Sequence, residues 1–123
     1  MKTSSLTVTG LAIAIVIPLI NADCNKPAFY LGCFKDTNSR DMHGLGIQNG
    51  YENSLMTVEM CTDHCRTRGF KYAGLQYARH CFCGDKFGKY GLADSDSECR
   101  MTCQGDPSQN CGAAARNSVY LIR

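Results

Sequence analysis

Near the middle of the chain the sequence runs Tyr77-Ala78-Arg79-His80-Cys81-Phe82-Cys83-Gly84. Its two cysteines alternate with an aromatic residue, so in a strand both cysteines face one side and Phe82 faces the other. Residues 72–77 form an apolar run before it, and Ala78-Arg79 would be the turn that joins the two. The stretch therefore predicts a β-hairpin whose second strand carries both cysteines on one face.

Helical signals lie on both sides of this hairpin. Thr57 is suited to cap a helix that ends before Gly69, and Ser97 is suited to cap a second short helix over residues 97–104. Each helix would carry two cysteines four residues apart, which places them on one face. These helical cysteines are Cys61, Cys65, Cys99 and Cys103.

The remaining segments complete the predicted fold. Residues 30–36 and 118–122 have strand character, and residues 41–53 form a long Gly-rich loop of the kind that often carries function. We therefore expect an α+β fold: a small disulfide-rich domain with an antiparallel sheet and two short helices.

Cysteine use indicates an oxidising compartment. All nine cysteines lie beyond residue 22, a density typical of secreted disulfide scaffolds. A zinc site built from Cys61, Cys65, Cys81 and Cys83 with His64 and His80 is disfavoured, because the spacing lacks the usual knuckles. No metal and no cofactor are expected. Nine is odd, and Cys24 is predicted to be the unpaired or intermolecular cysteine.

The first residues predict export. Lys2 precedes an apolar run over residues 6–20, which is too short to span a bilayer, and Ala22 suits a cleavage site. We assign residues 1–22 to a signal peptide and 23–29 to an N-terminal arm. No later apolar span predicts a membrane anchor, and no basic stripe predicts nucleic-acid binding. The domain, residues 30–123, is expected to be secreted, and its association with the cell wall is a further hypothesis.

Four motifs occur in a defined order along this domain: Tyr30-Leu31-Gly32-Cys33-Phe34, Met56-Thr57-Val58-Glu59-Met60-Cys61-x3-Cys65, Tyr77-x3-Cys81-Phe82-Cys83-Gly84 and Asp106-Pro107-Ser108-Gln109-Asn110-Cys111-Gly112. The set resembles the WSC domain, named for fungal cell-wall stress sensors and also present in Kremen-type receptors. The resemblance implies a PAN-like fold, binding of wall polysaccharide and four disulfides. The cysteines in register are Cys33, Cys61, Cys65, Cys81, Cys83, Cys99, Cys103 and Cys111.

Sugar binding needs aromatic rings for the faces of pyranoses and polar side chains for their hydroxyls. The chain has no Trp but eleven Phe and Tyr residues. Phe82 is the first candidate for stacking, because the opposite face of its strand is committed to bridges. Gln76 and Tyr77 alternate on one strand, so only one of them should share the face of Phe82. The predicted ligand-binding residues are Phe82, Tyr77, Arg79, Gln76, Asp85 and Tyr90.

The sequence also bears on two other classes of function. An enzyme is not expected: the acidic residues 94–98 are typical of a helix N-terminus, and no histidine sits in a nucleophile-like pattern. A secreted ligand or effector of a protein partner is the alternative, and it would show a contiguous apolar patch. Polysaccharide is the expected partner, with a disulfide-linked homodimer through Cys24 as a further hypothesis.

Overall fold

The structure, a computed structural model, describes residues 27–123. The predicted signal peptide and Cys24 lie outside the described residues. The predicted hairpin is present as β3 (Tyr72–Gln76) and β4 (His80–Gly84), joined by a three-residue loop at 77–79. It lies inside a five-stranded sheet with the order β1-β7-β3-β4-β2, in which every pairing is antiparallel.

One side of the sheet is built from both ends of the described chain. β1 (Phe29–Lys35) pairs with β7 (Arg116–Leu121), and β7 pairs with β3, so the chain's last strand lies between two earlier ones. At the other edge, β2 (Tyr51–Glu52) pairs with β4. Phe29, assigned to the arm from the sequence, is the first residue of β1.

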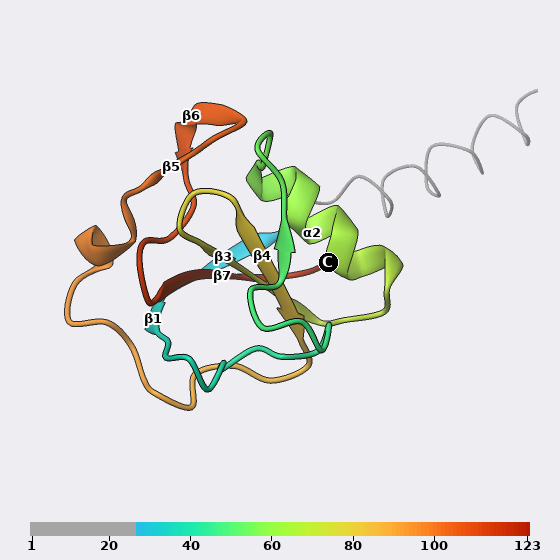
Figure 1. Cartoon of the computed structure of the whole chain (residues 1–123), viewed down its shortest axis with the longest axis horizontal. Coiled ribbons are helices and arrows are strands. Elements are labelled where there is room, and N and C mark those ends of the chain that lie inside the picture. The colour runs from blue at the N-terminus through green and yellow to red at the C-terminus, as the bar shows by residue number, and fades with distance from the viewer. Residues whose placement is uncertain (1–26) are drawn as a thin grey trace, which may run out of the picture.

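The first predicted helix is confirmed as α2 (Val58–Thr67). The Thr57 side chain accepts a hydrogen bond from the Met60 backbone N–H at 3.0 Å, and the acidic Glu59 occupies the first turn. The chain leaves the helix through Gly69, whose φ is +83°. The helix α2 packs on the sheet (Figure 1). Cys61 and Cys65 are buried in the cluster that α2 forms with β3 and β4.

The second predicted helix is wrong. Only a single 3-10 turn, η1 (Asp96–Cys99), forms, and its cap is Ser95, which makes a reciprocal capping box with Glu98. After this turn the Met101 N–H donates to the Gly112 carbonyl, so the backbone is extended where the helix was expected. β5 (Thr102–Cys103) and β6 (Asp106–Asn110) then form a ribbon that projects from the sheet (Figure 1). The described residues thus hold one α-helix, not two.

All eight cysteines predicted to be bridged are bridged. α2 is bonded to β4 twice, and the η1 turn is bonded to β1. A fourth bridge closes the β5–β6 ribbon. The pairs are Cys61–Cys81, Cys65–Cys83, Cys33–Cys99 and Cys103–Cys111. This pairing could not be derived from the spacing of the cysteines.

Two apolar clusters lie on opposite faces of the sheet. The bridged cysteines of α2 and β4 pack with Met56 and Leu75 on the helix face. Phe82 packs with Met42 and Val119 on the other face, as strand alternation predicts. No helix within residues 27–123 is long and apolar enough to cross a membrane.

Candidate functional site

The face of the sheet away from α2 is crossed by residues 36–50, which comprise the turn after β1 and most of the Gly-rich loop. Two glycines let this loop approach β4: the Gly44 N–H donates to the Cys83 carbonyl at 2.8 Å, and a Cβ on Gly50 would lie 2.3 Å from the Cys81 carbonyl oxygen. Between loop and hairpin lies a cavity of about 500 Å³. We call it the Arg40 hollow; its principal lining residues are Asp36, Arg40, Asn49, Gln76, Tyr77 and Phe82.

A buried polar network forms the base of the Arg40 hollow. The Asp36 carboxylate is buried, and its Oδ2 lies 3.3 Å from Nη1 of Arg40. The buried Gln76 amide donates to Asp36 Oδ2 at 2.8 Å and to Asn117 Oδ1 at 3.0 Å. The backbone N–H of Asp41 donates to Asp36 Oδ1 at 2.9 Å. The one carboxylate and the one guanidinium cancel, so the base is polar but carries no net charge.

Arg40 holds the loop in place. Its Nε donates to the Gln48 carbonyl at 2.8 Å, and its Nη2 donates to Asn49 Oδ1 at 3.2 Å. Its guanidinium carbon lies 5.1 Å from the centre of the Phe82 ring, within the range of a cation–π contact. The Asn49 carbonyl also lies 2.8 Å from Nδ1 of His80. The loop is therefore fixed by polar contacts rather than by a disulfide.

Tyr77 is the exposed aromatic residue of this hollow. It is 46% exposed, and both it and Ala78 have positive φ, at 53° and 68°. Strand alternation ends at this loop, so Gln76 and Tyr77 both line the hollow with Phe82. The expectation that only one of the two could do so is wrong, because it assumed an extended backbone at residue 77.

Phe82 does not present an open ring. It is only 2% exposed, packed on Met42 and Val119 and covered by Arg40. In this conformation it cannot stack on a sugar, and its place is in the second apolar cluster. Its expected exposure is therefore wrong, although it lies directly beneath the hollow.

The other predicted residues lie at different distances from Tyr77. Arg79 pairs with Glu52 at 2.6 Å, and its guanidinium carbon lies 5.9 Å from the centre of the Tyr77 ring. The Tyr90 hydroxyl donates to the carbonyl of Ser39 at 2.5 Å, next to the turn that borders the hollow. Asp85 lies at the far end of the hairpin, where its Oδ1 accepts from the Lys71 N–H at 3.1 Å. Asp85 is thus not brought together with the others.

Sequence reasoning missed Asp36, Arg40 and Asn49. They lie in a turn and a loop, where polar side chains are usually solvated, and their contacts reach Gln76 from 40 and 36 residues away. Of these three residues only Asn49 lies in the loop over residues 41–53, which its length and glycine content singled out.

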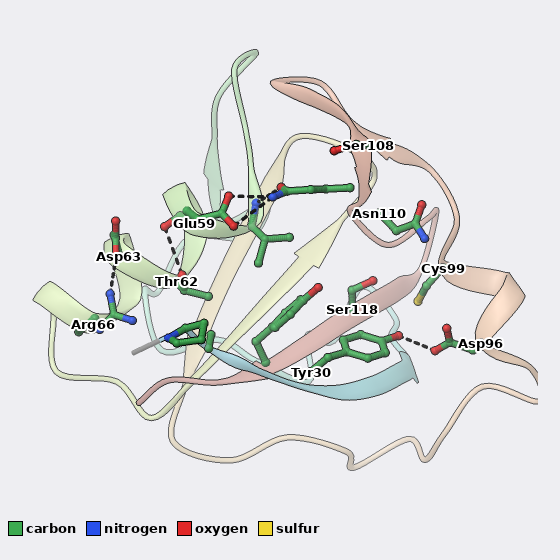
Figure 2. A pocket seen from close by; sticks show the side chains of 15 residues that line it. Tyr30, Glu59, Thr62, Asp63, Arg66, Asp96, Cys99, Ser108, Asn110 and Ser118 are labelled. Atoms are coloured by element: carbon green, nitrogen blue, oxygen red, sulfur yellow. Dashed lines mark hydrogen bonds and ion pairs between the residues drawn. The ribbon is translucent and has the colours of Figure 1, made fainter. Parts of the chain in front are cut away.

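A second, larger cavity of about 700 Å³ lies on the helix face. Side chains from β1, α2, β6 and β7 converge on it (Figure 2). We call it the Tyr30 hollow; its principal lining residues are Tyr30, Glu59, Arg66, Asp96, Asn110 and Tyr120. Burial and the hydrogen bond to the Asp96 carboxylate raise the pKa of the Tyr30 hydroxyl well above its ordinary value.

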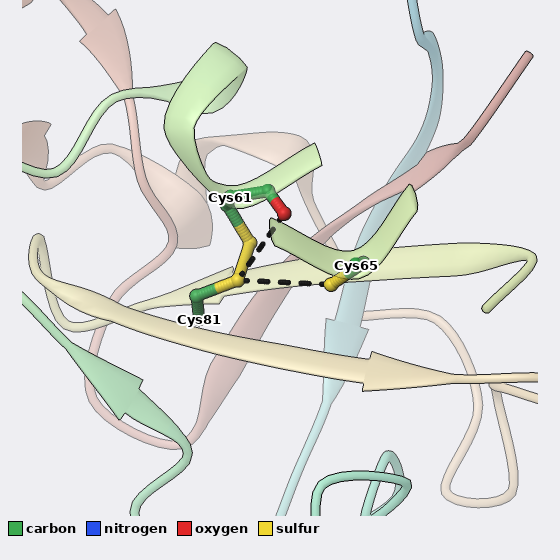
Figure 3. Close-up of side chains that lie close together, drawn as sticks. All are labelled: Cys61, Cys65 and Cys81. Carbon is green, nitrogen blue, oxygen red and sulfur yellow. Dashed lines mark hydrogen bonds between the residues drawn. A yellow bond between two sulfur atoms is a disulfide. The ribbon is translucent and has the colours of Figure 1, made fainter. Parts of the chain in front are cut away.

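The three sulfur atoms of Cys61, Cys65 and Cys81 lie within 4.8 Å of one another (Figure 3). Cys61 and Cys81 are bonded to each other, and Cys65 is bonded to Cys83. Thiolates, rather than bridged sulfurs, are the ligands of zinc. The cluster can therefore hold a metal only after reduction of both bridges, and with the bridges intact it is part of the core.

Comparison with known proteins gives one consistent family. The sequence profile of the WSC domain matches residues 30–113. A WSC domain-containing protein of Arthroderma benhamiae is 33% identical over 110 residues, which cover 87% of this chain and 12% of that protein. Kremen protein 1 of Homo sapiens is 36% identical over 100 residues, covering 79% of this chain and 20% of its own length.

Xylosyltransferase oxt of Drosophila pseudoobscura pseudoobscura is 33% identical over 90 residues, which cover 73% of this chain and 10% of that protein. This chain therefore spans a fifth or less of the length of these three relatives. The profile match covers more than half of the chain and includes all eight bridged cysteines. The chain belongs to the WSC domain family.

Proposed function

We propose that this domain binds an uncharged cell-wall-type polysaccharide, of the glucan, chitin or xylan class, at the Arg40 hollow, and that it catalyses no reaction. The observation that carries the proposal is the exposed ring of Tyr77 beside fixed hydrogen-bonding groups in a WSC domain. An aromatic ring matches the C–H face of a pyranose, while Asn49 and Arg40 can bond to its hydroxyls.

The charge of the site supports a neutral ligand. Asp36 and Arg40 neutralise each other, so neither an anionic nor a cationic sugar gains from a net charge at the base. Gln76 and Asp36 already hold one another, and this keeps the donors and acceptors preorganised for binding.

The contact area of a single shallow hollow favours weak binding, with a dissociation constant in the ~1 µM to 1 mM range. A disulfide between the Cys24 residues of two chains would raise avidity on a repetitive polymer. All eight cysteines within residues 27–123 are bonded to one another, so none of them competes for Cys24. A non-reducing gel that shows only monomer for the mature protein would refute this dimer.

Secretion is part of the proposal. Four disulfides fit an oxidising space outside the cytosol. Cleavage after Ala22, wall association and the PAN-like classification stay predictions. N-terminal sequencing of the protein from culture medium tests the first of these.

The test is a pull-down of the mature domain on insoluble β-1,3-glucan, chitin, xylan and cellulose, with Tyr77→Ala as the variant. Loss of the Tyr77 ring should weaken binding about tenfold, the effect of removing one stacked aromatic ring. Phe29→Ala is the matched control, since Phe29 is 53% exposed but lies on β1 outside the hollow. Phe82→Ala is unsuitable, because it would empty the second apolar cluster.

Binding to one polymer that Phe29→Ala retains and Tyr77→Ala loses would establish the site. Equal binding by wild type and Tyr77→Ala would reject the Arg40 hollow. No binding to any polymer, with four disulfides confirmed, would favour the alternative function, recognition of a protein partner.

A further inference from the structure

The Tyr30 hollow is built around a pair of aromatic rings. Tyr30 and Tyr120 are cross-strand partners on β1 and β7, and their ring centres lie 5.2 Å apart at an angle of 55°. Tyr30 is 38% exposed and borders the open side of the hollow. Such a pair offers an apolar and electron-rich surface to a ligand.

The carboxylates around these rings are not neutralised. Asp63 is paired with Arg66, but neither Glu59 nor Asp96 has a cationic partner within residues 27–123. Both are held by neutral donors. The Gln109 amide donates to the two Glu59 oxygens at 2.8 and 3.0 Å, and the Tyr30 hydroxyl donates to Asp96 at 2.5 Å. The hollow therefore carries about two net negative charges.

The negative charge of the hollow also affects the pKa of a tyrosine that lines it. Burial raises the pKa of the Tyr120 hydroxyl, and the charges of Glu59 and Asp96 raise it further. The same negative charge repels uronic acids and sulfated sugars and attracts a cation, which the two rings can also stabilise through their faces. The Tyr30 hollow thus carries a net negative charge, whereas the charges of Asp36 and Arg40 cancel in the Arg40 hollow.

The polar border of the hollow suits a sugar. The side chain of Asn110 on β6 is among those that line the cavity (Figure 2). Ser108 lies beside it on the same strand. Amide and hydroxyl groups next to an aromatic floor can bond to several sugar hydroxyls, whereas the aliphatic stem of a lysine would leave them without partners.

We propose that the Tyr30 hollow is a second glycan-binding site, which takes a sugar bearing a protonated amine, as in polymers of β-1,4-linked glucosamine. One amine would lie near Asp96, with its sugar ring against Tyr30, and the amine of a neighbouring unit would lie near Glu59 (Figure 2). The two hollows open on opposite faces of the sheet, so both can be occupied at once. The proposal goes beyond the neutral-polysaccharide site and does not depend on it.

The test is calorimetric titration with a glucosamine tetramer at low salt and mildly acidic pH, where the amine is protonated and charges are little screened. The N-acetylglucosamine tetramer, of equal length but uncharged, is the comparison ligand. The glucosamine tetramer should bind at least about tenfold more tightly, which corresponds to ~1.4 kcal/mol. Equal affinity for the two tetramers would overturn the proposal.

The key variant is Glu59→Gln with Asp96→Asn, which removes two charges and keeps the shape of both side chains. Its affinity for the glucosamine tetramer should fall about tenfold or more. The matched control is Asp85→Asn with Asp94→Asn, which changes the net charge equally at two exposed sites outside the hollow. A similar loss in both double variants would show general charge attraction and would overturn the site.

Two further measurements separate this proposal from its rivals. Tyr77→Ala should leave binding of the glucosamine tetramer unchanged, even if it abolishes binding to neutral polymers; loss of both would mean one shared site at the Arg40 hollow. Tetralysine should bind less tightly than the glucosamine tetramer. If tetralysine bound more tightly, and lost its affinity in the Glu59 and Asp96 variant, the hollow would be assigned to basic peptides instead.

Discussion

The segments that cover the two faces of the sheet are held in place by different kinds of interaction. On the helix face, α2 is joined to β4 by two disulfides and packs over a buried cluster. On the other face, residues 36–50 have no disulfide and no regular secondary structure. Polar contacts of Arg40 and Asp36 and the burial of Met42 against Phe82 hold them in place. The comparison shows that so small a domain can shape a hollow on each face of its sheet by different means.

The first way to test this difference is to remove a bridge from the helix face. Cys61→Ala with Cys81→Ala opens a disulfide between residues 20 positions apart, and it should lower the free energy of unfolding by about 3 kcal/mol. Denaturant unfolding followed by circular dichroism measures the change. NMR chemical shifts of the Arg40 hollow should stay close to wild type; a wide collapse there would show that the two faces are not independent.

The second way is to block the approach of the loop to β4. Gly50 and Gly46 both have positive φ, at +64° and +71°, but only Gly50 would place a Cβ against backbone, 2.3 Å from the Cys81 carbonyl oxygen. Gly46→Ala should cost about 1 kcal/mol for its backbone conformation alone. Gly50→Ala should cost about 2 kcal/mol more, because the loop must also move. Similar unfolding midpoints for the two variants would contradict the close packing.

The third way is to separate charge from packing at the base of the Arg40 hollow. Arg40→Met leaves the buried Asp36 without its cation and should cost about 2 kcal/mol. Adding Asp36→Asn removes the unpaired charge and should recover most of the loss. A double-mutant cycle of unfolding free energies measures this coupling; additive losses would mean that Arg40 acts by packing alone.

The smallest effect concerns the edge of the helix face. His64 on α2 stacks on Tyr51 of β2, with ring centres 4.0 Å apart, and burial, together with Arg68, lowers the pKa of His64 below its ordinary value of 6.5. At a pH between the pKa of His64 in the folded protein and 6.5, the unfolded chain binds more protons than the folded protein. Neutral His64 therefore makes its full contribution to the free energy of unfolding above pH 6.5. That contribution is lost as the pH falls from 6.5 through the folded pKa.

The free energy of unfolding should therefore fall slightly more from about pH 8 to about pH 5 in wild type than in His64→Phe. His43→Phe is the control, because His43 is an exposed residue of the loop. An NMR titration that places the pKa of His64 above 6.5 would reverse the sign of the effect.

Local signals account for the parts of the fold that the sequence predicted. The alternation of Cys81 and Cys83, and Thr57 followed by Cys61 and Cys65, are spacings within one element, and the corresponding strand and helix are present. The second helix failed because Ser95 and Glu98 form the capping box, and the cysteines that follow are drawn into different contacts. Helical spacing alone could not reveal this.

The candidate site was predicted in part. The sequence singled out Gln76 and Tyr77, which do line the Arg40 hollow. It could not supply Asp36 and Arg40, since their contacts with Gln76 depend on where a long loop crosses the sheet. The Tyr30 hollow depends on the pairing of β1 with β7, which only the structure shows.

The bridge between Cys33 and Cys99 encloses both hairpin strands, α2 and the whole segment of residues 36–50 within one covalent ring. A protease that cuts once anywhere between these two cysteines leaves two fragments that are still joined. Because the cut ends stay tethered, the fragments can remain folded together and need not diffuse apart. In a medium rich in hydrolases, such a domain would survive a first nick as a two-chain protein.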